Sequence, residues 1–124
     1  MFMQNIQETI AQELLCLAKQ KLSQCAAAKM SQTIVLRGES GKLYSVFASL
    51  EDLPAGEDTI CRQLSDASDT GITHMAVLWE NGQVDLPSHR LRSRLVALDT
   101  KNRDALILLQ GEMGTSFLPL HKTL

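Results

Sequence analysis

The sequence predicts an α/β protein, a three-layer α-β-α sandwich built around a mixed sheet. Two apolar runs, ITHMAVLW and ALILL, have the length and continuity of strands that are buried on both faces. A helical pattern lies between them, and a strand-helix-strand order favours a right-handed crossover. Amphipathic helices placed before and between the strands then cover both faces of the sheet.

The composition fits a single domain spanning residues 1–124. Hydrophobic residues make up 44% of the chain and charged residues 21%, the balance of a globular protein. A chain of this length buries enough surface to fold without disulfides or a structural metal. No internal repeat, low-complexity run or linker divides it.

Charge and cysteine usage narrow the partners and the compartment. A formal net charge of -2 gives no overall attraction to nucleic acid or acidic membranes. The three cysteines form no CxxC pair, which favours reduced thiols and a cytoplasmic location. The N-terminus does not read as a signal peptide. No stretch approaches the roughly 20 apolar residues of a membrane span.

Residues 4–29 are expected to form one amphipathic helix. Its apolar face comprises Ile6, Ile10, Leu14, Leu17, Ala18, Leu22, Cys25 and Ala26. A strict heptad fails at Glu13, so packing on the core is favoured and self-association stays open as the alternative. Residues 33–37 and 43–48 then predict a β-hairpin around the turn GESG.

Pro54 and Gly56 predict a loop over LEDLPAGED. A second helix is expected over residues 57–68, with Glu57 and Asp58 in its first turn, where acidic side chains suit the helix dipole. The run ITHMAVLW predicts the central strand, and Asn81-Gly82 returns the chain into QVDL.

A third helix is expected from Ser88 to Leu98. DTKNRD turns the chain into the strand ALILL, and TSFLPL forms a last strand that Pro119 confines to an edge of the sheet. The predicted order is helix, strand, strand, helix, strand, short strand, helix, strand, strand.

This order is similar to the cytidine-deaminase-like fold. In that family the zinc ligands stand at the starts of the second and third helices, as (H/C)xE and PCxxC. Here the second helix begins GEDTICRQL, and the third begins PSHRLR with Ser88 and Leu91 at the two cysteine positions. The resemblance therefore implies the fold without its zinc site. No cofactor is expected, and no working deaminase of the known kind.

Other candidate centres are few. A metal set could only combine Cys61, His89 and a carboxylate of Glu57 or Asp58, and a half-buried cysteine with a surface histidine is the favoured interpretation. His74, on the central strand, is expected to be a satisfied core residue rather than a ligand or base. Cys61 would need a nearby base and a lowered pKa to act as a nucleophile. His121 lies in the tail, where disorder is common.

The stretch LPSHRLRSRL concentrates positive charge at the start of the third helix. Cations there oppose the helix dipole, although the free N–H groups and a serine cap can bind an anion. Carboxylates such as Glu57, Asp58 and Asp85, a neighbouring subunit or a bound anion could each supply the missing negative charge. The candidate anion-binding residues are Ser88, His89, Arg90, Arg92 and Arg94.

Two classes of function follow, and the sequence leaves open whether the protein is an enzyme. The first is a non-catalytic domain that self-associates as a homo-oligomer or binds a partner, because no catalytic constellation is present. The second is a binding or enzymatic domain for a small anionic, nucleotide-like metabolite. Nucleic acid is not an expected partner, because Trp79 and Tyr44 do not alternate with basic residues.

Overall fold

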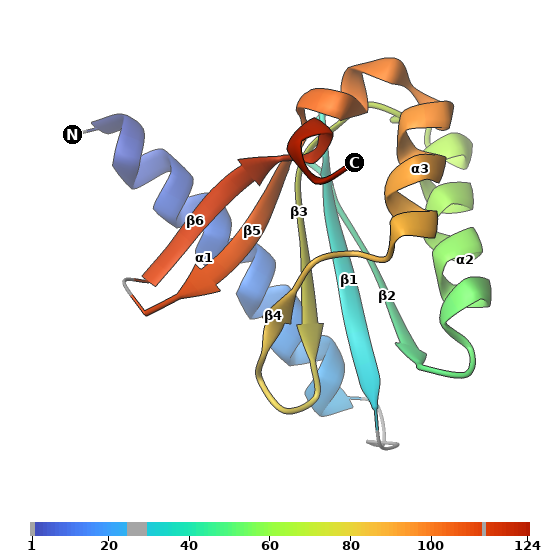
Figure 1. The fold of residues 1–124 in the computed structure, drawn as a ribbon, viewed down its shortest axis with the longest axis horizontal. Helices are drawn as coiled ribbons and strands as arrows, with labels where there is room; N and C mark the ends of the chain where they lie inside the picture. The colour runs from blue at the N-terminus through green and yellow to red at the C-terminus, as the bar shows by residue number, and fades with distance from the viewer. Residues whose placement is uncertain (1, 25–29, 113) are drawn as a thin grey trace.

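The computed structural model describes residues 2–24, 30–112 and 114–124. Within them, three helices and six strands follow the predicted order (Figure 1). The helices are α1 (Phe2–Gln24), α2 (Leu53–Asp66) and α3 (His89–Leu98). The strands are β1 (Ser31–Gly38), β2 (Leu43–Ser49), β3 (Ile72–Trp79), β4 (Val84–Asp85), β5 (Leu106–Gly111) and β6 (Gly114–Pro119). Two short 3-10 helices, η1 (Thr100–Asp104) and η2 (Leu120–Thr123), complete the described elements.

The strands form the predicted mixed sheet, in the order β2-β1-β3-β5-β6 with β4 also paired to β3. β1 is antiparallel to both of its neighbours, β3 and β5 are parallel, and β6 is an antiparallel edge strand. Pro119 ends this edge strand, as its position in TSFLPL predicts.

One edge of β3 is shared between two strands. β5 pairs with its first half, at His74 and Met75, while β4 pairs with its second half, at Val77 and Leu78. The far end of the β5–β6 hairpin therefore extends away from β3 (Figure 1). The predicted full burial of ALILL is right for Ala105, Ile107 and Leu108 and wrong for the other two residues, Leu106 and Leu109, which are partly buried. Leu109 lies beyond the part of β5 that pairs with β3.

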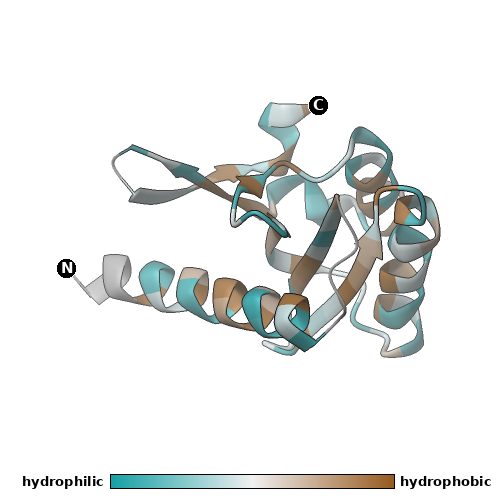
Figure 2. Cartoon of the chain, turned by 90° about the horizontal axis from the view of Figure 1, so that it is seen from below, coloured by the Kyte–Doolittle hydropathy of each residue, from teal (hydrophilic) through white to brown (hydrophobic). Residues whose placement is uncertain are grey.

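Helices cover both faces of the sheet (Figure 2). Each face has its own cluster of buried apolar side chains. Alternate residues of β3 divide between them: Met75 and Val77 pack with α2 and α3, whereas Ala76 and Leu78 pack with α1. The same alternation separates Ile107 from its neighbour in β5. The three-layer arrangement is thus the direct consequence of consecutive apolar residues in the central strand, which present apolar side chains to both faces of the sheet.

The second helix begins earlier than the sequence predicts. α2 starts at Leu53, so the expected loop over LEDLPAGED is wrong for all but its first three residues. Pro54 occupies the first turn, where its missing N–H would have no helical partner in any case. Glu57 and Asp58 consequently lie in the second turn, farther from the positive end of the dipole than expected.

The two ends of the chain differ from expectation in smaller ways. α1 follows the predicted amphipathic pattern from Ile10 onward, with Leu14 and Ala18 fully buried. The placing of Ile6 on the core face is wrong, because its side chain is 56% exposed and packs in neither core cluster. Its predicted continuation through Cys25 and Ala26 lies outside the described residues. His121 belongs to η2, and the buried side chain of Leu120 anchors this segment.

The GESG turn is held against the loop that precedes β3. The Ser40 hydroxyl donates to the Asp69 carboxylate at 2.5 Å, and the Tyr44 hydroxyl donates to the same group at 2.8 Å. The hydrogen bond from Ser40 holds the pKa of Asp69 below its ordinary value. This turn is therefore a packing element of the fold.

Among the described residues, no helix combines the length and the apolar composition that crossing a membrane requires.

Candidate functional site between α2 and α3

The start of α3 faces α2, and acidic side chains of α2 meet the basic side chains of α3. Glu57 and Asp58 project from α2, while Ser88, Arg90 and Arg94 come from the α3 side. Ser88 caps α3 by accepting a hydrogen bond from the Leu91 amide at 3.1 Å. The two helices are thus joined by charged and polar contacts at this end of their interface.

Glu57 is the buried centre of this junction, with only 2% of its side chain exposed. Its carboxylate accepts a 2.5 Å hydrogen bond from the Ser88 hydroxyl and pairs with Arg90 at 3.2 Å. A buried carboxylate is tolerated only with such partners, because removing its water is costly. Glu57 therefore locks the start of α3 onto α2.

Asp58 makes a different kind of contact. Its Oδ1 accepts from Arg90 Nη2 at 3.0 Å and also pairs with Arg94. All three side chains are between 41% and 46% exposed. Water screens such pairs, so they contribute little to stability.

Carboxylates of the same chain thus supply the negative charge that the basic helix start requires. Glu57 and Asp58 take this role for Arg90 and Arg94. Asp85, the third candidate, instead accepts hydrogen bonds from the Trp79 indole at 3.0 Å and from the Leu86 amide.

The other predicted anion-binding residues point elsewhere. Arg92 donates to the backbone carbonyls of Pro87 at 3.1 Å and Thr123 at 2.6 Å, and so connects α3 to the end of the chain. His89 is exposed, with its Nε2 3.4 Å from the Ser93 hydroxyl. Of the five predicted residues, Arg94 alone lines the neighbouring groove.

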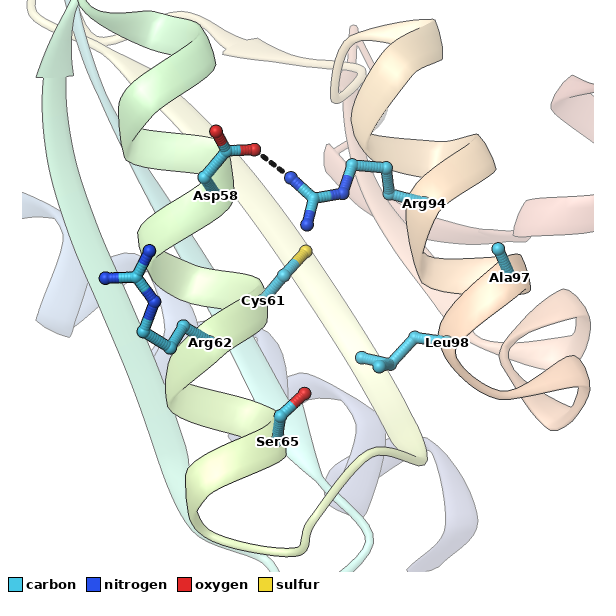
Figure 3. Close-up of a pocket in the computed structure, with 7 residues that line it drawn as sticks. All are labelled: Asp58, Cys61, Arg62, Ser65, Arg94, Ala97 and Leu98. Atoms are coloured by element: carbon cyan, nitrogen blue, oxygen red, sulfur yellow. Dashed lines mark hydrogen bonds and ion pairs between the residues drawn. The ribbon is translucent and has the colours of Figure 1, made fainter.

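A groove of about 590 Å³ runs between the two helices beside this junction (Figure 3). α2 contributes Asp58, Cys61, Arg62 and Ser65, and α3 contributes Arg94, Ala97 and Leu98. Arg94 and Cys61 point across the space between the helices, whereas the Arg62 guanidinium points away from α3. The groove joins a charged end to an apolar wall.

The thiol of Cys61 lines the groove but is not activated. Burial raises its pKa above the ordinary value, and the charge of Glu57 adds to this effect while Arg90 opposes it. Cys61 is only 4% exposed. Such a thiol stays protonated near neutral pH, which disfavours the nucleophile hypothesis.

The residues at the family's zinc-ligand positions do not fit a zinc ion. Ala55-Gly56-Glu57 has the glutamate of (H/C)xE but an alanine at the ligand position. Ser88 and Leu91 replace the two cysteines. The hydroxyl of Ser88 is engaged by Glu57, and the side chain of Leu91 is fully buried in the core. Three donors are needed for a catalytic zinc, and these positions offer none that is suited to it.

The alternative metal set is not assembled either. Cys61 lines the groove, but His89 is not among the lining residues. In the described part of the chain, no group of three or more histidine, cysteine, aspartate or glutamate side chains could hold a metal ion.

His74 is a satisfied core residue, as the sequence favours. Its Nδ1 lies 2.9 Å from the Thr73 hydroxyl and its Nε2 lies 2.9 Å from Gln7 Oε1. The ring packs edge-on against Phe117 with centroids 5.1 Å apart. Burial lowers the pKa of His74 to about 4, and the charge of Arg37 adds to this effect.

Sequence patterns single out the arginines of this site more clearly than its other members. Glu57 was one of the carboxylates expected to balance these arginines, and it also stands two residues after Ala55, in the place of the family's glutamate. Ser65 and Ala97 had none, since only the relative rotation of α2 and α3 turns them toward the same groove.

Comparison with known proteins agrees with the topology. No protein-family model matches the sequence, and no curated protein matches it. Among solved structures, the cytidine deaminase from Bacillus anthracis is similar, with a TM-score of 0.69 at 17% identity over 92% of this chain and 86% of that one. The cytidine deaminase from Burkholderia pseudomallei has a TM-score of 0.67 at 15% identity, over 90% of this chain and 94% of that one. The cytidine deaminase from Mycobacterium leprae has a TM-score of 0.63 at 13% identity, again over 90% of this chain and 94% of that one. The chain has the cytidine-deaminase-like fold.

Proposed function

We propose that this protein binds a small anionic, nucleotide-like ligand in the groove between α2 and α3, and that it does so without a zinc ion. The observation that carries the proposal is the position of Arg94. Its guanidinium stands on the groove wall, and the ion pair that it makes among the described residues is with the exposed carboxylate of Asp58. A guanidinium in this setting can exchange one anionic partner for another.

The rest of the groove supports a ligand with a flat, mostly apolar part. Ala97 and Leu98 form an apolar wall, and the Ser65 hydroxyl adds a hydrogen-bonding group. Small-molecule sites combine an apolar lining with a few polar groups in this way. The solved proteins of this fold are named as cytidine deaminases, which favours a nucleotide-like ligand.

The free thiols of Cys16 and Cys61 support a reducing, cytoplasmic location as part of the same proposal.

Calorimetry and thermal shift with cytidine monophosphate, adenosine monophosphate and inorganic phosphate test the proposal. At least one of the three should bind the wild type and raise its melting temperature. Arg94→Ala should weaken that binding about tenfold or more, since a charge-assisted hydrogen bond is lost.

Arg103→Ala is the matched control, because Arg103 is an exposed arginine of η1 outside the groove. It should bind as the wild type does. The absence of binding to the wild type, or equal binding by Arg94→Ala, would remove the proposal.

Self-association is a second candidate, favoured by a pair of exposed apolar side chains. Met30 is 55% and Leu50 48% exposed, and their backbones are joined by a 2.9 Å hydrogen bond. We infer that such a pair could contribute to a contact between two copies. Light scattering after size exclusion should then show a dimer or larger species, and Met30→Lys with Leu50→Lys should shift it to a monomer. A wild-type monomer at high concentration would exclude this function.

A further inference from the structure

The outer edge of β2 has no strand partner in the described part of the chain. β2 stands at one end of the sheet and pairs with β1 alone. Its other edge therefore presents backbone N–H and C=O groups that can pair with a further strand. A hollow of about 560 Å³ at the start of β2 is lined by the consecutive residues Lys42, Leu43, Tyr44 and Ser45. Because consecutive side chains point to opposite faces of a sheet, this hollow follows the edge.

β2 lacks the features that normally keep a sheet edge from pairing. Native edge strands carry charged side chains, a proline or a bulge. The sequence of β2, LYSVFAS, contains no charged residue and no proline, and its register with β1 is regular from Leu43 to Ser49. At the opposite edge of the sheet, β6 ends in Pro119. The edge of β2 is therefore the one suited to the addition of a strand.

The residues of β2 suit pairing with a second copy of the same strand. In an antiparallel pair centred on Val46, this valine lies opposite its own copy on a two-fold axis. Tyr44 then lies opposite Ala48 on one face of the sheet. Ser45 lies opposite Phe47 on the other face. A large side chain thus meets a small one in each cross-strand pair, and a two-fold contact of this kind is complete in a dimer.

The charges that flank β2 also favour a second copy. Lys42 precedes the strand, Leu50 follows it, and the acidic residues Glu51 and Asp52 come next; all four are exposed. In the antiparallel register, Lys42 lies opposite Leu50 of the second copy and close to its acidic pair, so opposite charges meet at both ends. Leu50, 48% exposed, is brought to the hollow at the start of the other strand.

We propose that the free edge of β2 pairs antiparallel with β2 of a second copy, so that the two sheets join across a two-fold axis. The partner of this edge is accordingly this chain itself. The inference rests on the self-association that was put forward above as the second candidate function, and it names the surface that carries the contact.

Val46→Cys tests the register. Two copies of this cysteine would lie directly opposite each other, with Cβ atoms about 5 Å apart, so the short thiol crosslinker dibromobimane should link them into a covalent dimer. Ser49→Cys is the matched control, because two copies of residue 49 would be roughly 20 Å apart along the paired strands. It should give no more covalent dimer than the wild type, whose native cysteines set the background.

Charged side chains test the same surface independently. When Ser45→Lys is combined with Phe47→Lys, each lysine faces a lysine of the second copy, and the dimer should weaken about tenfold or more. Ser45→Glu combined with Phe47→Glu should act in the same way. Mixed in equal amounts, the two double variants should form a heterodimer, because opposite charges then meet. Sedimentation velocity measures the dimer, and thermal unfolding checks that each double variant is folded.

The outcomes separate this inference from self-association in general. If the wild type is a dimer but Val46→Cys gives only the background of crosslinking, the β2 edge is wrong and self-association through another surface stands. Equal crosslinking of Ser49→Cys, or folded double variants that dimerise as the wild type does, also overturns the edge contact. Crosslinking decides the matter if a double variant fails to fold. A wild-type monomer at high concentration removes self-association itself.

Discussion

Two adjacent acidic residues show how burial decides what an ion pair contributes. Glu57 and Asp58 both pair with Arg90, yet the first side chain is 2% exposed and the second 44%. An unpaired buried carboxylate is costly, whereas an exposed one simply returns to water. Their neighbouring positions in the sequence conceal this difference.

Substitution of the two residues should therefore have unequal effects on stability. Glu57→Gln removes the charge that Arg90 faces and should lower the free energy of unfolding by about 2 kcal/mol. Asp58→Asn should lower it by less than about 1 kcal/mol. Urea unfolding of the two variants measures both values. Equal losses would show that the Glu57 contact is no stronger than the exposed one.

His74 should make stability depend on pH. Its pKa is about 4 in the folded protein and about 6.5 in an unfolded chain, so the unfolded chain binds more protons between these values. The contribution of His74 to the free energy of unfolding should be fully present above pH 6.5. It should be lost as the pH drops toward 4, by about 3 kcal/mol over the whole window. The side chains that contact the imidazole, those of Gln7, Thr73 and Phe117, carry no group that titrates in this range.

Urea unfolding at several pH values between these limits checks this expectation. His74→Phe should flatten the slope of unfolding free energy against pH in this window, whatever its effect on stability at neutral pH. An identical slope in the wild type and the variant would contradict the assignment to His74.

At the scale of elements, α2 approaches β2 closely because of a glycine. A Cβ atom added to Gly56 would lie 2.8 Å from the Cβ of Ala48. Alanine is normally the better helix former, by about 1 kcal/mol. The close contact reverses this preference here, because the helix would have to move away from the strand.

Gly56→Ala should consequently destabilise the protein by about 1 kcal/mol or more. Adding Ala48→Gly should recover part of the loss, since it removes the atom in the way. Gly111→Ala is a control for added volume, because an added Cβ there meets nothing within 4 Å. Thermal unfolding of the single and double variants measures the coupling. A double variant that loses the sum of both single effects would contradict a direct contact.

At the scale of the whole molecule, the protein shares the fold of cytidine deaminases but not the residues at their zinc-ligand positions. The described chain covers most of the length of several cytidine deaminases, but the zinc-ligand positions hold Ala55, Ser88 and Leu91. Fold similarity alone does not establish activity. The residues that a zinc-activated hydroxide requires are what distinguish a deaminase.

Purified from zinc-supplemented medium, the protein should contain far less than one zinc ion per chain and release no ammonia from cytidine. Metal analysis and a deamination assay check this, with a zinc-dependent cytidine deaminase as the positive control. One zinc per chain that a chelator removes and added zinc restores would contradict the argument from the donor set.

Local patterns were sufficient for much of the architecture. The apolar runs around Met75 and Ile107 predicted the buried strands, and alternating helices predicted the two covering layers, because burial on both faces requires apolar residues throughout. The start of α2 was missed, since Pro54 is typical both of a loop and of a first helical turn. The partial exposure of β5 was missed because it depends on which strand occupies the edge of β3.

Part of the candidate site, likewise, could be predicted from the sequence, and part of it could not. The sequence by itself determined that the start of α3 carries unbalanced positive charge and that the zinc-ligand pattern is incomplete, because both properties belong to contiguous residues. Only the tertiary structure decided that Glu57 is buried, that Asp58 faces two arginines and that Arg92 points to the end of the chain. Burial and pairing across two helices depend on their relative rotation and distance, which no local pattern of residues encodes.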